Sequence, residues 1–201
     1  MGAAAAPDVA GYADLFLLRL EPVAVSQLLP LFFKNNYSLD IKNSALFASG
    51  VFFAGVIGDS LGGVLSDRIL KRTGNIRLAR LSVIILGFAG ALLSLLPILV
   101  VHDMTIVALC LSSGFFFAEL VIGPIWSVPM DITPEYCSTA TGMMSAGATI
   151  GSIISPVVAG FLIDRTGNWN LPFATAIAVL LVGTVLAFFI KPERPFAPEA
   201  A

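Results

Sequence analysis

Five long apolar stretches dominate the chain, and short polar connectors separate them. Each stretch is long enough for a membrane-spanning helix, which needs about 20 mostly apolar residues. They cover residues 44–65, 81–101, 104–129, 141–162 and 171–190. The second, fourth and fifth contain no Asp, Glu, Lys or Arg, and each of the others contains one. The pattern predicts an all-α membrane protein.

A sixth candidate span, residues 12–33, is weaker. It carries three charged residues and is interrupted by Pro22 and Pro30, and only 22–33 is apolar enough for the membrane interior. We therefore expect a bundle of five to six transmembrane helices. The predicted domains are a poorly defined N-terminal segment (1–27), a helical membrane domain (28–190) and a Pro-rich disordered tail (191–201).

A short pattern occurs twice, 97 residues apart, as GVLSDR at 63–68 and GFLIDR at 160–165. Each copy closes a long apolar segment. If the segments are counted as spans, the two copies lie on opposite sides of the bilayer. That arrangement is typical of an inverted-topology repeat, in which three helices are followed by three more of opposite orientation, as in many secondary transporters. We therefore predict a 3+3 inverted repeat.

The connectors predict the orientation. Cations are concentrated in residues 66–80 and in the tail, where seven occur, against three in the connectors of the other side. Cytoplasmic loops carry an excess of Lys and Arg. The 66–80 loop and the C-terminus are therefore expected in the cytoplasm, with the chain in the inner membrane as a multi-pass protein.

Composition supports the membrane assignment and narrows the chemistry. Charged residues make up 12% of the chain, about half of what a soluble domain carries. The single histidine, His102, is expected in a loop, so an intramembrane Ser–His pair is not available, and no His-Glu-x-x-His occurs. Cys110 and Cys137 suit neither a disulfide nor a metal site. The sequence therefore predicts no enzyme, metal or cofactor.

Small residues recur at a spacing that lets helix backbones approach closely in a membrane. They form two sets, Gly58, Gly62 and Ser66, and Gly147, Gly151 and Ser155. Tight packing in a helical bundle accounts for most of them. The alternative is a pair of surfaces that slide or rock during a transport cycle.

Residues 62–75, GGVLSDRILKRTGN, resemble the loop signature of the major facilitator superfamily. The resemblance implies that Gly63 and Asp67 belong to a gating motif, in which the acid lies among basic residues and clasps neighbouring helices. The basic residues here are Arg68, Lys71 and Arg72. Positive-inside signalling alone explains these cations but not the acid among them.

Residues 123–156 resemble the anion:cation symporter family within that superfamily. The similar features are a Trp in a Pro-containing helix, an Asp-Ile-x-Pro loop and a downstream Ser-Pro. Residues 160–173 also fit the family's bacterial members. The chain departs from the pattern at Ser145, where Asn is common, and at Ser138, where Gly is usual. The resemblance covers roughly 28–195, which corresponds to the C-terminal half of such a transporter.

Two carboxyl groups lie inside the predicted spans. A charge at the bilayer centre costs about 2.5–3.5 kcal/mol on insertion scales, so such residues usually face a bundle interior or a wet cavity. Glu119 lies ten residues before Pro129, which is about 15 Å along a helix. Asp59 lies about 12 Å from Asp67 by the same measure. Either is a candidate proton carrier, or else a structural carboxyl that stays protonated or hydrogen-bonded.

Candidate substrate contacts follow on the same helix and the next. Trp126 and Ser127 come two helical turns after Glu119 and can share its face. The indole offers a flat wall and an N–H donor for a sugar-like or carboxylated ligand, although an interfacial Trp would have the same sequence signature. Ser145 and Thr149, one turn apart, are candidates on the facing helix.

The sequence therefore predicts the C-terminal half of a secondary active transporter for a small organic anion, with a sugar acid or related carboxylate as substrate. A proton or other cation would be the coupling ion. Its protein partner would be a separate N-terminal half or a second copy of the chain. The alternative is a truncated membrane fragment or interaction module that transports nothing, as the weak first span suggests.

Overall fold

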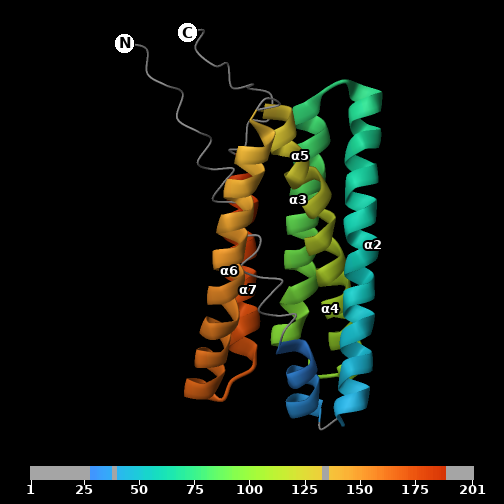
Figure 1. Cartoon of the computed structure of the whole chain (residues 1–201). Helices are drawn as coiled ribbons and strands as arrows, with labels where there is room; N and C mark the ends of the chain where they lie inside the picture. Colours follow the sequence, from blue (N-terminus) through green and yellow to red (C-terminus); the bar gives the residue numbers. More distant parts are fainter. Residues whose placement is uncertain (1–27, 38–39, 133–135, 189–201) are drawn as a thin grey trace.

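The computed structural model describes residues 28–37, 40–132 and 136–188, and all regular elements in these ranges are helical. Residues 28–37 are helical. The remaining helices are α2 (Ile41–Thr73), α3 (Ile76–Leu95), the 3-10 helix η1 (Leu96–Leu99), α4 (Met104–Leu120), α5 (Ile122–Ile132), α6 (Cys137–Thr166) and α7 (Asn170–Ala187). They run lengthwise through an elongated bundle (Figure 1). The predicted N-terminal segment (1–27), which includes the first part of the weak candidate span 12–33, and the predicted tail (191–201) lie outside the described residues.

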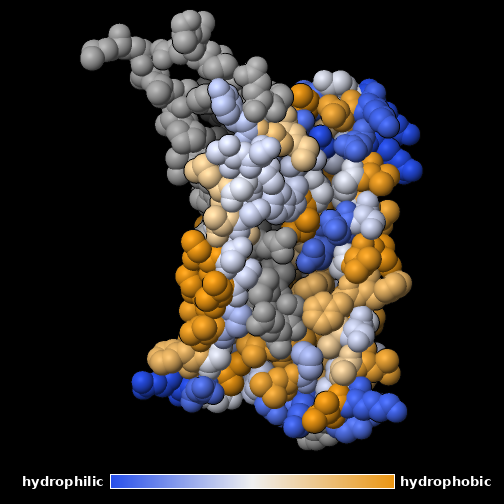
Figure 2. All heavy atoms as spheres, viewed as in Figure 1, coloured by the Kyte–Doolittle hydropathy of each residue, from blue (hydrophilic) through white to orange (hydrophobic). Residues whose placement is uncertain are grey.

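Every strong apolar stretch of the sequence falls on these helices. Within the described ranges, four helical units are long and apolar enough to cross a membrane, namely Ile41–Thr73, Ile76–Leu99, Met104–Asp131 and Cys137–Thr166. The fifth stretch is a shorter apolar helix, Asn170–Val185. Hydrophilic atoms gather at the two ends of the molecule and apolar atoms dominate its middle (Figure 2). The all-α membrane fold is confirmed.

The two copies of the repeated pattern end helices at opposite ends of the bundle (Figure 1). Both helices end in Arg-Thr and are followed by Gly-Asn, and the glycines Gly74 and Gly167 adopt the same left-handed conformation, with φ 64°. In each corner the glycine N–H donates to the carbonyl four residues earlier, and the Thr hydroxyl accepts from the Asn N–H. The inverted placement predicted from the repeat is therefore present in the structure.

α4 and α5 form one span with a break at Val121. Pro124 has no N–H to donate to the carbonyl of Leu120, so the regular helical ladder cannot continue through this point. The Val121 N–H instead donates to Ala118 at 3.4 Å, which is a 3-10 contact. Pro129 and Pro156, by contrast, lie inside continuous helices.

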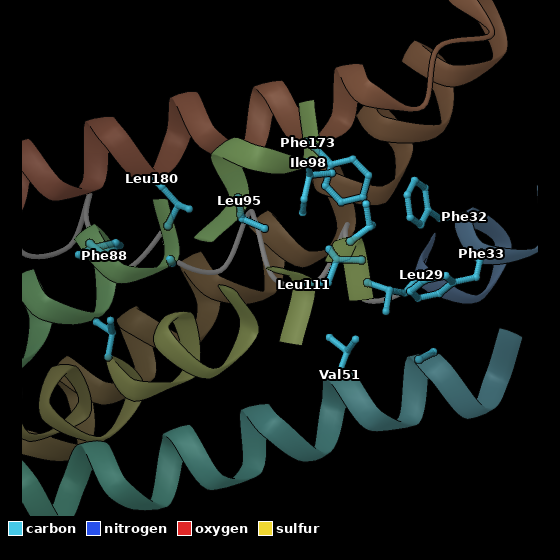
Figure 3. Packing of buried hydrophobic residues seen from close by; sticks show 14 of the residues in the cluster. Leu29, Phe32, Phe33, Val51, Phe88, Leu95, Ile98, Leu111, Phe173 and Leu180 are labelled. Atoms are coloured by element: carbon cyan, nitrogen blue, oxygen red, sulfur yellow. The ribbon is translucent and has the colours of Figure 1, made fainter. Parts of the chain in front are cut away.

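The apolar core fills the space between α3, α4 and α7 and extends to residues 28–37. Figure 3 shows Phe32 close to Phe173 of α7 at one end, with Phe33 beside Leu29, while Phe88 and Leu180 lie farther along the bundle. The Phe32 and Phe173 rings meet edge to face, with centroids 5.0 Å apart. This contact joins the first described helical segment, residues 28–37, to α7.

α2 and α4 approach each other through glycine. A Cβ atom at Gly58 would overlap the carbonyl oxygen of Phe116, and one at Gly62 would overlap that of Leu120. Ser66, the third small residue of the set, is fully buried. The structure thus confirms the close packing predicted for this set. In the second set, Gly151 and Ser155 are buried and Gly147 is half-buried.

Candidate functional site

Glu119 lies in the last turn of α4 and faces α2. Its side chain is half-buried, and a Cβ atom at Gly55 would lie 3.1 Å from its Cγ. The ring of Phe115, one turn earlier on α4, fills the other side of Gly55, with Cδ1 2.8 Å from the same position. The absence of a side chain at Gly55 is therefore what lets Glu119 and Phe115 pack against the α2 backbone.

Asp59 is exposed on α2, between Gly58, which packs on Phe116, and Gly62, which packs on Leu120. One face of α2 meets the α4–α5 span twice, through the edge-to-face rings of Phe52 and Phe115 and through close approach of Gly63 to Gly123. Asp59 is two turns after Phe52 and one turn before Gly63, so it lies on this same flank of α2. Glu119 lies between Phe115 and Gly123 on the partner span. Both carboxyl groups are therefore located between the same two contacts.

Trp126 and Ser127 lie on α5, beyond the break. The indole of Trp126 is half-buried and packs against the main apolar core. The Ser127 hydroxyl donates to the carbonyl of Gly123 at 3.0 Å within its own helix. Part of the Trp126 surface is thus used in packing, and the remainder is accessible.

Ser145 and Thr149 are exposed on α6, and the Thr149 hydroxyl donates to the Ser145 carbonyl at 2.8 Å. α6 packs against α5 and α7. In Figure 1 it lies on the opposite side of the bundle from α2. Glu119 and Asp59 thus lie on helices that pack against each other, whereas Ser145 and Thr149 lie on a helix that packs elsewhere in the bundle.

A charge network closes the end of the bundle where α2 and α3 meet. Arg80 of α3 is only 6% exposed and donates to three partners. Its Nε bonds Asp131 of α5 at 2.9 Å, and its Nη1 bonds Asp67 at 3.0 Å and the Ser66 hydroxyl at 2.8 Å. Ser66 in turn donates to the Ala79 carbonyl. One guanidinium thus holds α2, α3 and α5 together.

This network differs from the one expected around Asp67. Arg68, Lys71 and Arg72 are exposed, and within the described part of the chain no ion pair involves them. They lie on the helix that carries Asp67, whereas the partner of Asp67 comes from the next helix. The sequence pattern identifies Arg80 only as one of the cations of the 66–80 loop, and Asp131 only as part of the Asp-Ile-x-Pro loop. It predicts no role in a charge network for either residue. The sequence feature that could have indicated this role is the position of Arg80 immediately before the uncharged apolar stretch 81–101.

The pentapeptide Gly58-Asp59-Ser60-Leu61-Gly62 has the Gly-x-Ser-x-Gly spacing of a hydrolase nucleophile. In the structure it lies in the middle of a straight helix, not at a strand-to-helix turn. Its two glycines pack on α4, and the Ser60 hydroxyl donates to the Val56 carbonyl at 3.0 Å. The pattern here serves helix packing.

An apolar hollow opens at the other end of the bundle, lined by Leu28, Phe32, Ile163, Trp169, Pro172 and Phe173. Its lining offers almost no polar surface, so it does not suit an anion. Among the described residues, no three His, Cys, Asp or Glu side chains cluster as metal ligands.

The chain is similar to known membrane transporters. The sequence model of the Major Facilitator Superfamily matches residues 131–201 of this chain. A protein of Cupriavidus necator named as a probable sulfoacetate transporter is 47% identical over 164 residues, which are 82% of this chain and 38% of that protein. A probable galactarate/D-glucarate transporter of Escherichia coli is 28% identical over 81% of this chain and 38% of its own length.

A solved structure of a peptide transporter, an E310Q mutant of POT in complex with alafosfalin, has the same fold. It superposes with a TM-score of 0.77 at 14% sequence identity, over 95% of this chain and 41% of that one. The chain thus spans about two fifths of the length of each of these proteins.

Proposed function

The chain belongs to the major facilitator superfamily, and we propose that it supplies the C-terminal half of a secondary transporter for small organic anions. It is a multi-pass membrane protein of a transporter family, not an enzyme. The partner in transport would be an N-terminal half or a second copy of this chain. We place the chain in the inner membrane. The α2–α3 corner and the C-terminus would face the cytoplasm, because cations are in excess at that end.

The substrate class is suggested by the relatives, whose names specify sulfoacetate, galactarate and glucarate. These molecules are small, strongly hydrophilic, and carry two acidic groups. Trp126, Ser127, Ser145 and Thr149 would supply this half's share of the contacts, as a flat apolar wall and short hydroxyls. The cationic partners of the two acidic groups would come from the other half.

The half-buried carboxyl of Glu119 at the α2–α4 contact is the observation that carries the coupling proposal. A charged carboxylate far from water is costly in a bilayer. Protonation removes that cost, so the protonation state of Glu119 would follow its access to water. Asp59, exposed on the flank of α2 that contacts the α4–α5 span, would pass the proton between Glu119 and solvent. The Asp67–Arg80–Asp131 network, with Gly63, Arg68, Lys71 and Arg72 beside it, would close the cytoplasmic end.

A fusion tests the proposal. The N-terminal part of the Cupriavidus necator relative, up to the start of the matched region, would be joined to this chain and reconstituted in liposomes. We expect saturable uptake of labelled sulfoacetate or glucarate that a pH gradient, acid outside, accelerates. Glu119→Gln should keep binding but remove the response to the gradient. Asp164→Asn, an exposed acid at the far end, is the matched control and should leave the response intact.

Two results would contradict these proposals separately. A well-folded fusion that takes up neither anion would refute the transport proposal and favour the non-transporting alternative. Uptake with an unchanged gradient response in Glu119→Gln would refute the coupling role alone.

A further inference from the structure

One exposed face of α2 carries apolar side chains along most of its length and cations at its C-terminal end. Phe53, Ile57, Leu61 and Val64 follow one another at intervals of three or four residues, and all are exposed. Arg68 and Lys71 continue the same spacing, with Arg72 beside them, and they too are exposed. Residues at this spacing share a helix face. The face is therefore apolar for about three turns and then cationic at the end of the helix.

This face points away from the candidate site. At about 100° per residue, Leu61 and Val64 lie roughly 140–160° around α2 from Asp59. Gly58 and Gly62, which pack on α4, lie between the two flanks. The cationic stripe is thus on the opposite flank of α2 from the one that carries Asp59.

The cationic end of α2 is about one helical turn longer than the corresponding end of α6 after the shared Asp. In the second repeat one arginine, Arg165, separates Asp164 from Thr-Gly-Asn, whereas in the first repeat the five residues 68–72 separate Asp67 from Thr-Gly-Asn. Four residues add about one helical turn, or 6 Å. Both corners nevertheless close with the same φ and the same hydrogen bonds. The added turn therefore lengthens α2 and adds two cations without changing how the chain turns.

The acids that the structure pairs at this end, the exposed Asp67 and the half-buried Asp131, both bind the buried Arg80. Arg80 takes both Asp67 and Asp131, so Arg68, Lys71 and Arg72 remain as an exposed cationic group at the edge of the apolar band. In Figure 2 hydrophilic atoms gather at the end where Figure 1 places the α2–α3 corner, directly beyond apolar atoms of α2.

We propose that this face of α2 binds an anionic phospholipid, with the acyl chains along Phe53, Ile57, Leu61 and Val64 and the phosphate at Arg68, Lys71 and Arg72. Apolar side chains match the acyl chains, and clustered cations match a negative headgroup. The site depends only on insertion of the chain in a bilayer, and it is independent of the transport proposal.

The test measures lipid selectivity on the full chain reconstituted in phosphatidylcholine. Spin-labelled phosphatidylglycerol and phosphatidylcholine would be compared by electron paramagnetic resonance for their relative affinity at the protein surface. We expect a preference for phosphatidylglycerol that Arg68→Gln/Lys71→Gln/Arg72→Gln abolishes. Each cation removed should lower the affinity for phosphatidylglycerol relative to phosphatidylcholine by up to about five-fold at low salt.

The matched control removes three cations from the opposite end, as Lys34→Gln/Lys42→Gln/Arg165→Gln, and so has the same net charge. It should keep the preference. Single variants and the helical circular dichroism signal check that each protein is folded. Equal loss in both triple variants, or no preference in the native chain, would overturn the proposal. So would displacement of the lipid by millimolar inorganic phosphate at constant ionic strength, because the ligand would then be a soluble anion.

Discussion

Gly62→Ala should destabilise the membrane bundle far more than Gly63→Ala, its immediate neighbour on α2. The two changes add the same methyl group to the same helix. At Gly62 the added Cβ would overlap the carbonyl oxygen of Leu120, and the contacting atoms are all backbone, whereas at Gly63 no heavy atom lies within 4 Å of it. A backbone cannot rotate away as a side chain can, so α4 would have to move as a unit.

The expected magnitude follows from two opposing terms. Replacing Gly by Ala inside a helix gains up to ~1 kcal/mol in backbone entropy, and Gly63→Ala should realise it. Overpacking costs about 1–3 kcal/mol, and Gly62→Ala should lose this much because the α2–α4 contact must open. Because both variants gain the same entropic term, they should differ by the overpacking cost alone, roughly 1–3 kcal/mol in their free energies of unfolding.

The assay is equilibrium unfolding of the full chain in mixed micelles by titration with sodium dodecyl sulfate, monitored by circular dichroism and tryptophan fluorescence. A further comparison uses Gly58→Ala, which should behave like Gly62→Ala because its Cβ would overlap the carbonyl oxygen of Phe116. Equal stability of the Gly62 and Gly63 variants would refute the inference that backbone contact at these glycines sets the α2–α4 distance.

Further predictions concern the charge network and the corners. Arg80→Gln should cost about 3 kcal/mol in unfolding free energy, because it leaves Asp131 without its cation, whereas exposed Arg68→Gln should stay within about 0.5 kcal/mol; similar effects of the two in the same titration would count against the network. Gly74→Ala and Gly167→Ala should each cost about 1–2 kcal/mol, because both residues have φ 64°. Gly50→Ala, in open space within a helix, is the control for these two, and a loss there as large as theirs would show that the left-handed conformation is not the cause.

The spans and the repeat could be predicted from the sequence because they depend on local properties. An uninterrupted run of about 20 apolar residues specifies a membrane helix wherever it packs. The spacing of Gly58, Gly62 and Ser66 likewise identified a surface for close approach, since that property follows from small side chains on one helix face.

The partners of the charged groups could not be predicted in the same way. Asp67 and Arg80 are on different helices, and Asp131 is 51 residues farther along the chain from Arg80. Which charges meet depends on how α2, α3 and α5 are packed, and nothing in the local pattern around Asp67 reports it. The core contact of Trp126 was missed for the same reason. The roles of Glu119, Asp59, Ser145 and Thr149 stay predictions.

The break at Val121 changes how a displacement travels along the α4–α5 span. A continuous helix acts as a stiff rod, so a push on one end moves the other. Where Pro124 removes a ladder bond, bending costs less. Glu119 precedes this joint, while the Asp131–Arg80 pair follows it. A shift of α4 on the glycine face of α2 can therefore be absorbed as an angle at Val121, and the far end of the span stays anchored to α3.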